Sequence, residues 1–100
     1  MYSLKIYLSA EKDWLELDSG LRDIFLKVLE RRLIEPHIVS ARLGGNLAGT
    51  YKIKLQRAGY RLVYEVQDET QILWVVAVGK RADGAIYRVA AERISRIQNP

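Results

Sequence analysis

One stretch of the chain, residues 51–66, reads YKIKLQRAGYRLVYEV and decides the fold. Apolar and polar side chains alternate along residues 51–56 and again along residues 60–66, a period of two that is typical of half-buried strands. The residues between them form a short loop, in which Gly59 can adopt a positive φ. The pattern predicts an antiparallel hairpin with Leu55 opposite Tyr60.

This register gives the hairpin two different sides. One side carries only apolar and aromatic side chains. On the other side Lys54 lies opposite Arg61, with Lys52 one pair further along. Like charges directly opposite each other destabilise a sheet. A solvated strand face explains most such pairs, but an anion site is at least equally well supported here, and phosphate is the obvious anion.

The composition narrows the class of protein. We expect one hundred residues, 49% hydrophobic and 28% charged, to form a single domain, residues 1–100. The short apolar runs and the lack of a signal-peptide core predict no membrane association and a cytoplasmic location. The absence of cysteine excludes disulfides and thiolate chemistry. A single histidine, His37, argues against zinc, and we interpret it as an exposed loop residue without a role.

The charge is unevenly distributed along the chain. Residues 1–50 carry seven basic and seven acidic side chains, whereas residues 51–100 carry nine and five. The whole net charge of +4 therefore lies in the half that contains the hairpin. A localised excess of positive charge favours a polyanionic partner, most often a nucleic acid.

The remaining elements follow from periodicity and from turn residues. Residues 4–8 alternate as a short strand, and Ser9 is placed to cap a helix that begins at Ala10. A second amphipathic helix runs from about residue 21 to residue 35, where Pro36 ends it.

The second half of the chain ends in a strand and a helix. Residues 71–79 are apolar on both faces, which indicates a central strand. A basic loop, residues 80–84, leads through Asp83, a candidate cap, into a helix over about residues 85–98. The order β-α-α-β-β-β-α predicts an α+β fold with an antiparallel central sheet and helices packed mainly on one face.

Four motifs together resemble those of one family: YKIKL at 51–55, GYRLVY at 59–64, VGKR at 78–81 and Tyr87. With these motifs the chain is similar to the RelE/ParE superfamily of type II toxin–antitoxin toxins, and within it to the RelE family. The resemblance covers nearly the whole chain. It implies a RelE-like fold and a metal-independent endoribonuclease without cofactors, which enters the ribosomal A site and cuts mRNA there.

The resemblance also implies partners and site residues. The partners are a RelB-like antitoxin, the ribosome and mRNA, with DNA contacted only through the antitoxin complex. The catalytic positions are Lys52, Lys54, Arg61, Arg81 and Tyr87. Close relatives carry a basic residue in the loop before the hairpin; this chain has Gly45 there, and Arg42 is the nearest cation that would bind RNA.

The implied chemistry is attack by the RNA 2′-hydroxyl, which leaves a 2′,3′-cyclic phosphate and a 5′-hydroxyl. Tyr87 is the candidate general base: the pKa of a free tyrosine hydroxyl is about 10, and neighbouring cations favour the phenolate. Arg81 would neutralise charge on the leaving oxygen, and Arg61 would grip the phosphate through its planar fork. Lys52 and Lys54 would stabilise the transition state.

Each assignment has a simpler alternative. Tyr87 can be a helix residue half packed on the sheet, Arg81 can pair with Asp83, and Arg61 can pair across the strand with Glu65. Two other functions also stay open: a ParE-like toxin that poisons DNA gyrase, and an inactive relative that only binds an antitoxin. We expect the antitoxin to lay a helix or strand on exposed apolar surface, with the final helix as the element it displaces.

Overall fold

A computed structural model describes the backbone of residues 1–98 and the side chains of residues 1–97. Its sheet has the strand order β1-β4-β3-β2, with β1 parallel to β4 and the other pairs antiparallel. The strands are β1 (Ser3–Ile6), β2 (Thr50–Leu55), β3 (Tyr60–Gln67) and β4 (Ile72–Lys80). The helices are α1 (Glu11–Leu15), α2 (Ser19–Ile34) and α3 (Ala85–Gln98). One 3-10 turn, Leu8–Ala10, lies between β1 and α1, and two more, Val39–Ala41 and Gly45–Leu47, lie between α2 and β2. The predicted α+β fold and element order are confirmed.

The hairpin of β2 and β3 has the register that the alternation predicts. Leu55 lies opposite Tyr60 and Lys54 lies opposite Arg61. Gly59 has a φ of 70° in the connecting turn. The pattern sufficed because a slip of one residue would turn every apolar side chain of the hairpin to the wrong face.

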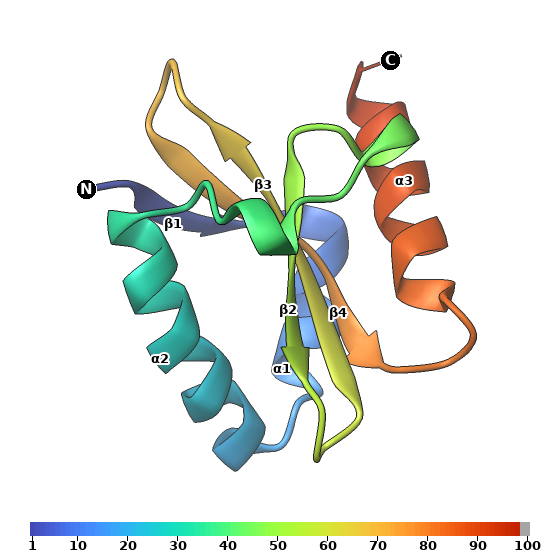
Figure 1. The fold of residues 1–100 in the computed structure, drawn as a ribbon. Coiled ribbons are helices and arrows are strands. Elements are labelled where there is room, and N and C mark those ends of the chain that lie inside the picture. The colour runs from blue at the N-terminus through green and yellow to red at the C-terminus, as the bar shows by residue number, and fades with distance from the viewer. Residues whose placement is uncertain (99–100) are drawn as a thin grey trace.

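Two cores lie on opposite faces of the sheet. The α2-side core consists of Leu17, Phe25, Leu29, Ala41, Tyr51, Ile53, Leu62, Tyr64, Leu73, Val75 and Val78. The α3-side core consists of Tyr7, Ala10, Leu47, Val63, Val76, Ala77, Ala90 and Ile94. Figure 1 shows α2 and α3 on the two sides of the sheet.

The sequence predicts helices mainly on one face of the sheet. In the structure α2 and α3 pack on opposite faces. Adjacent residues of a strand point to opposite faces, and both Leu62 and Val63 are fully buried. The same is true of Val75 and Val76 in β4. The two central strands are therefore apolar on both faces, and α3 covers the face that α2 leaves open.

The helix starts differ from the sequence expectation. Ser9 lies inside a 3-10 turn, and the residue that precedes α1 is Ala10, which makes no side-chain capping bond. The Asp18 carboxylate instead accepts a hydrogen bond from the Gly20 amide at 3.1 Å. This N-cap lets α2 begin at Ser19, two residues before the position expected.

His37 has partners that the sequence did not indicate. Its Nδ1 lies 2.7 Å from the Tyr51 hydroxyl, and its Nε2 lies 2.7 Å from Asp68 Oδ1. The Tyr2 hydroxyl donates to the same carboxylate oxygen at 2.6 Å. These bonds join the N-terminus, the segment after α2 and the β3–β4 turn. His37 is the exposed loop residue that the sequence predicts, but its bonds give it a structural role that the sequence did not indicate.

Asp68 gives this cluster a pH dependence that can be measured. Hydrogen bonds from Tyr2 and then His37 lower the pKa of Asp68 below its usual value of 3.8. Because the folded pKa lies below the unfolded one, the stabilisation is complete above pH 3.8 and is lost as the pH falls through the folded value. Asp68→Asn should lower the free energy of unfolding at pH 7, and the difference from the wild type should shrink in acid.

The measurement is urea unfolding from pH 2 to pH 7. Glu69→Gln is the matched control, since Glu69 lies next in the same turn and forms no ion pair within residues 1–97. A difference between Asp68→Asn and wild type that is constant with pH would contradict the role given to the charge.

No helix of the described residues is long and apolar enough to cross a bilayer.

Candidate active site

The predicted cations meet at a pocket beside the start of α3. The pocket has a volume of about 310 Å³. Its lining residues are Lys54, Arg61, Arg81, Ala82, Asp83, Gly84, Ala85, Ile86 and Tyr87. Four of the five residues assigned as catalytic therefore line one pocket, although they come from β2, β3, the loop after β4, and α3.

Arg61 is the most buried of these cations, with 9% of its surface exposed. It lies in β3 between Lys54 of β2 and Gly79 of β4. Its Nη1 donates to the Tyr60 carbonyl at 3.1 Å, which holds the guanidinium at the edge of the pocket. A buried guanidinium surrounded by other cations is poorly solvated and is therefore well suited to bind an anion.

Lys52 and Lys54 lie on the same face of β2, two residues apart, and so on the same side of the sheet as Arg61. The positive charge of Lys52 is the largest cause of a lowered pKa at Lys54. Desolvation comes next, followed by the charges of Arg61 and Arg81. Lys52 thus belongs electrostatically to the cluster, although it does not line the pocket. Bound phosphate would relieve this mutual repulsion.

Arg81 is held by its backbone. Its amide donates to the Gly59 carbonyl at 2.6 Å, which ties the loop after β4 to the turn of the hairpin. Its side chain is exposed. The ion pair with Asp83 that would make Arg81 an ordinary surface residue is not formed, and neither is a pair between Arg61 and Glu65. Glu65 instead accepts from the Tyr7 hydroxyl at 2.8 Å.

Tyr87 lies in the first turn of α3, partly exposed. The neighbouring residue, Ile86, packs closely on Gly79: a Cβ built on Gly79 would lie 2.9 Å from Ile86 Cδ1. The missing side chain allows the first turn of α3 to approach the sheet next to Arg61. The sequence pattern gave Gly79 no role, although a glycine inside a strand often marks such a close approach.

Arg42 does not join the cluster. It is exposed and forms an isolated bridge with Tyr51 at the outer edge of β2. It is not among the residues that line the pocket. Gly45 has a φ of 60° in a separate 3-10 turn. RNA binding by Arg42 remains a prediction.

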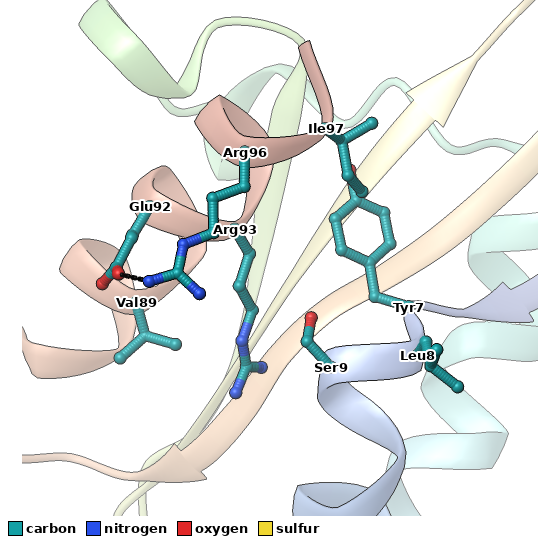
Figure 2. Close-up of a pocket in the computed structure, with 8 residues that line it drawn as sticks. All are labelled: Tyr7, Leu8, Ser9, Val89, Glu92, Arg93, Arg96 and Ile97. Atoms are coloured by element: carbon teal, nitrogen blue, oxygen red, sulfur yellow. Dashed lines mark hydrogen bonds and ion pairs between the residues drawn. The ribbon is translucent and has the colours of Figure 1, made fainter. Parts of the chain in front are cut away.

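A larger groove on the other side of α3 has different electrostatics. It has a volume of about 520 Å³ and lies between residues 7–9 and residues 89–97 of α3 (Figure 2). Its arginines are paired: Arg96 with Glu92 at 2.6 Å, and Arg93 with Asp13 at 2.8 Å. The cations of the smaller pocket have no carboxylate partner within residues 1–97. The smaller pocket is therefore the better anion site.

The side chains that line this pocket are suited to binding a phosphate. Among the described residues, no group of three His, Asp or Glu side chains is placed to hold a metal ion. Two guanidinium groups and the Lys54 ammonium line the pocket and can bind and stabilise a phosphate, and the Tyr87 hydroxyl can exchange a proton.

Comparisons with known proteins agree with the motifs. Residues 4–84 match the family described as "ParE toxin of type II toxin-antitoxin system, parDE". The chain is 45% identical to a RelE-like toxin protein of Escherichia coli, and 41% identical to the mRNA interferase toxin RelE of E. coli strain K12. Each of these alignments covers 93% of this chain and 97% of the relative.

Solved structures of RelE toxins are similar to this chain as well. A variant of the E. coli toxin RelE with two arginines changed to alanine, in the free state, superposes with a TM-score of 0.84 at 40% identity, covering 93% of this chain and 97% of that one. In the intact E. coli RelBE toxin–antitoxin complex the matching chain gives 0.76 at 41% identity, covering 80% and 96%. The chain belongs to the RelE/ParE family of type II toxin–antitoxin toxins.

Proposed function

We propose that this protein is a RelE-type mRNA interferase, which cuts mRNA in the ribosomal A site and so halts translation in the cytoplasm. One observation carries the proposal: Lys54, Arg61, Arg81 and Tyr87 meet at one pocket, and the cations have no carboxylate partners there. Relatives that are 41% identical carry the name mRNA interferase.

The pocket supports a division of roles in the cleavage step. Tyr87 takes the proton from the 2′-hydroxyl, whose oxygen then attacks the adjacent phosphorus. Arg61 and the two lysines stabilise the negative charge that develops on the phosphate oxygens. Arg81 stabilises the 5′-oxygen as its bond to phosphorus breaks, since an arginine pKa above about 12 makes proton donation demanding. The released 5′-oxygen takes a proton from water, and the products are a 2′,3′-cyclic phosphate and a 5′-hydroxyl.

Dependence on the ribosome follows from the geometry of the attack. The reaction needs the 2′-oxygen, the phosphorus and the leaving oxygen held in line. Correct positioning of reacting groups contributes up to about 7–11 kcal/mol in favourable cases. The pocket is open and small, and the ribosome holds the codon in place for it.

A ParE-like toxin that acts on DNA gyrase is the second candidate, because the matching family carries the ParE description. An in vitro translation reaction with mapped mRNA ends separates the candidates. Cuts within A-site codons support the interferase. Intact mRNA together with inhibited DNA supercoiling supports the gyrase toxin, and neither effect supports an inactive relative that only binds an antitoxin.

The antitoxin gives a prediction of its own. Relatives are solved as RelBE complexes, and we propose that a RelB-like antitoxin binds this chain by displacing α3. Ile97 of α3 and Leu8 are both exposed and line the same groove, so this side of α3 is incompletely covered (Figure 2). Antitoxin binding should speed amide hydrogen exchange over residues 85–98 and leave β3 and β4 protected, because the antitoxin covers the sheet in place of the helix. Unchanged exchange of α3 would exclude this mode.

A further inference from the structure

The loop that follows β4 has an unusual backbone. Asp83 has a φ of 47° and Gly84 a φ of 75°, so two consecutive residues are left-handed. Glycine adopts this region freely, whereas an aspartate does so at some cost. The loop lies between Arg81 and Tyr87, and its residues line the pocket. Its conformation therefore sets the direction of both side chains.

The turn itself is closed by the Ala85 amide, which donates to the Ala82 carbonyl at 2.8 Å. Two further bonds tie this loop to the rest of the protein. At the start, the Arg81 amide donates to the Gly59 carbonyl at 2.6 Å. At the end, Arg88 Nη1 donates to the Asp83 carbonyl at 2.9 Å, reaching back from α3 across the turn. A Cβ built on Gly84 would lie 3.8 Å from Arg88 Nη1 and 4.0 Å from Tyr87 Cδ2. The guanidinium and the Tyr87 ring thus flank the same glycine.

Arg88 differs from the other arginines of α3. Arg93 and Arg96 pair with carboxylates, whereas Arg88 forms no ion pair within residues 1–97. Within residues 1–97 its guanidinium makes one hydrogen bond, to the Asp83 carbonyl in the pocket wall. Because Asp83 is exposed, water can replace this bond at little cost to stability. The bond from Arg88 to the Asp83 carbonyl anchors the turn to α3.

We propose that Arg88 is a positioning residue of the RNA-cleaving site: by holding the left-handed turn at Asp83 and Gly84, it fixes Arg81 and Tyr87 in their places around the phosphate. The inference rests on the proposed function. Small displacements of catalytic groups slow reactions strongly, by up to about 100-fold for 1 Å. Loss of Arg88 should therefore lower the rate of the chemical step more than the affinity.

The test compares Arg88→Ala and Arg88→Lys with Arg96→Ala, a matched loss of one positive charge on the same helix. For each variant, single-turnover cleavage on mRNA-programmed ribosomes is measured at saturating toxin, together with Kd at several salt concentrations and Tm. We expect Arg88→Ala to slow saturated cleavage about tenfold or more, with Kd and Tm close to wild type. Arg88→Lys should retain most activity because an ammonium reaches the same carbonyl. Arg96→Ala should cleave normally.

Two results would overturn the inference. One is normal saturated cleavage by Arg88→Ala. The other is a weakened Kd with a smaller salt dependence and an unchanged saturated rate, because that pattern marks a direct contact with an RNA phosphate. A wild-type protein that leaves programmed mRNA intact would instead refute the proposed function, so the two failures are distinguishable.

Discussion

Arg81→Ala and Tyr87→Phe should each slow mRNA cleavage on programmed ribosomes by about 100-fold or more while leaving the fold intact. For Tyr87 the reason is the loss of general-base assistance, which is typically worth about 10²–10⁴-fold. For Arg81 it is the loss of charge stabilisation at the leaving oxygen, and removal of one such donor costs about 10²–10³-fold in other enzymes. Arg81 is exposed and Tyr87 only partly buried, so neither change opens a cavity in a core.

The measurement is single-turnover cleavage, with circular dichroism and Tm as checks on folding. Tyr2→Phe and Arg96→Ala are the matched controls, because they remove the same groups at positions outside the pocket. Cleavage by Tyr87→Phe at the wild-type rate would show that another group accepts the proton. Normal cleavage by Arg81→Ala would show that Arg81 has no role in catalysis.

Lys54→Met should combine a loss of activity with a gain in stability. Activity should fall about 100-fold, because a cation next to the transferring phosphate is lost. Stability should rise, because Lys54 lies opposite Arg61 and its pKa is lowered chiefly by Lys52. Like-charged pairs across a sheet are unfavourable. Methionine keeps most of the aliphatic stem, so the change removes the charge and little packing.

The lowered pKa fixes the pH dependence of this gain. A lysine whose folded pKa lies below its unfolded pKa loses its proton more readily in the folded protein. Wild-type stability should therefore gain from rising pH as Lys54 deprotonates, and Lys54→Met should lack this contribution. Urea unfolding between pH 7 and pH 10.5 measures it, with Lys27→Met on α2 as the control. A destabilised Lys54→Met would show that the cation cluster carries no electrostatic strain.

The hairpin is predictable from sequence because its information is local. A period of two, a glycine turn and a short loop fix which residues face each other. The like-charged pair at Lys54 and Arg61 therefore follows from the sequence alone. Arg81 and Tyr87 could not be placed by pattern alone; the family motifs supplied them, and the structure brings them to the same pocket.

Three features that the sequence did not predict depend on contacts between separate elements of the fold. The side of the sheet that α3 covers is set by the two-faced burial of β3 and β4. The bonds of His37 join segments 31 residues apart. The close packing of Ile86 on Gly79 arises only where α3 reaches the strand. The last two features have no periodic signature, because they are decided by which surfaces meet after the elements have formed. The apolar run of residues 71–79, in contrast, already indicated a strand that is covered on both faces.

The most direct test uses an mRNA with a single 2′-deoxynucleotide in the A-site codon, placed so that the cleaved linkage lacks its 2′-hydroxyl. If cations hold the phosphate while the RNA supplies its own nucleophile, the substituted message stays intact on the ribosome. The unmodified message should then end in a 2′,3′-cyclic phosphate. Cleavage of both messages at the same position and rate would contradict this mechanism.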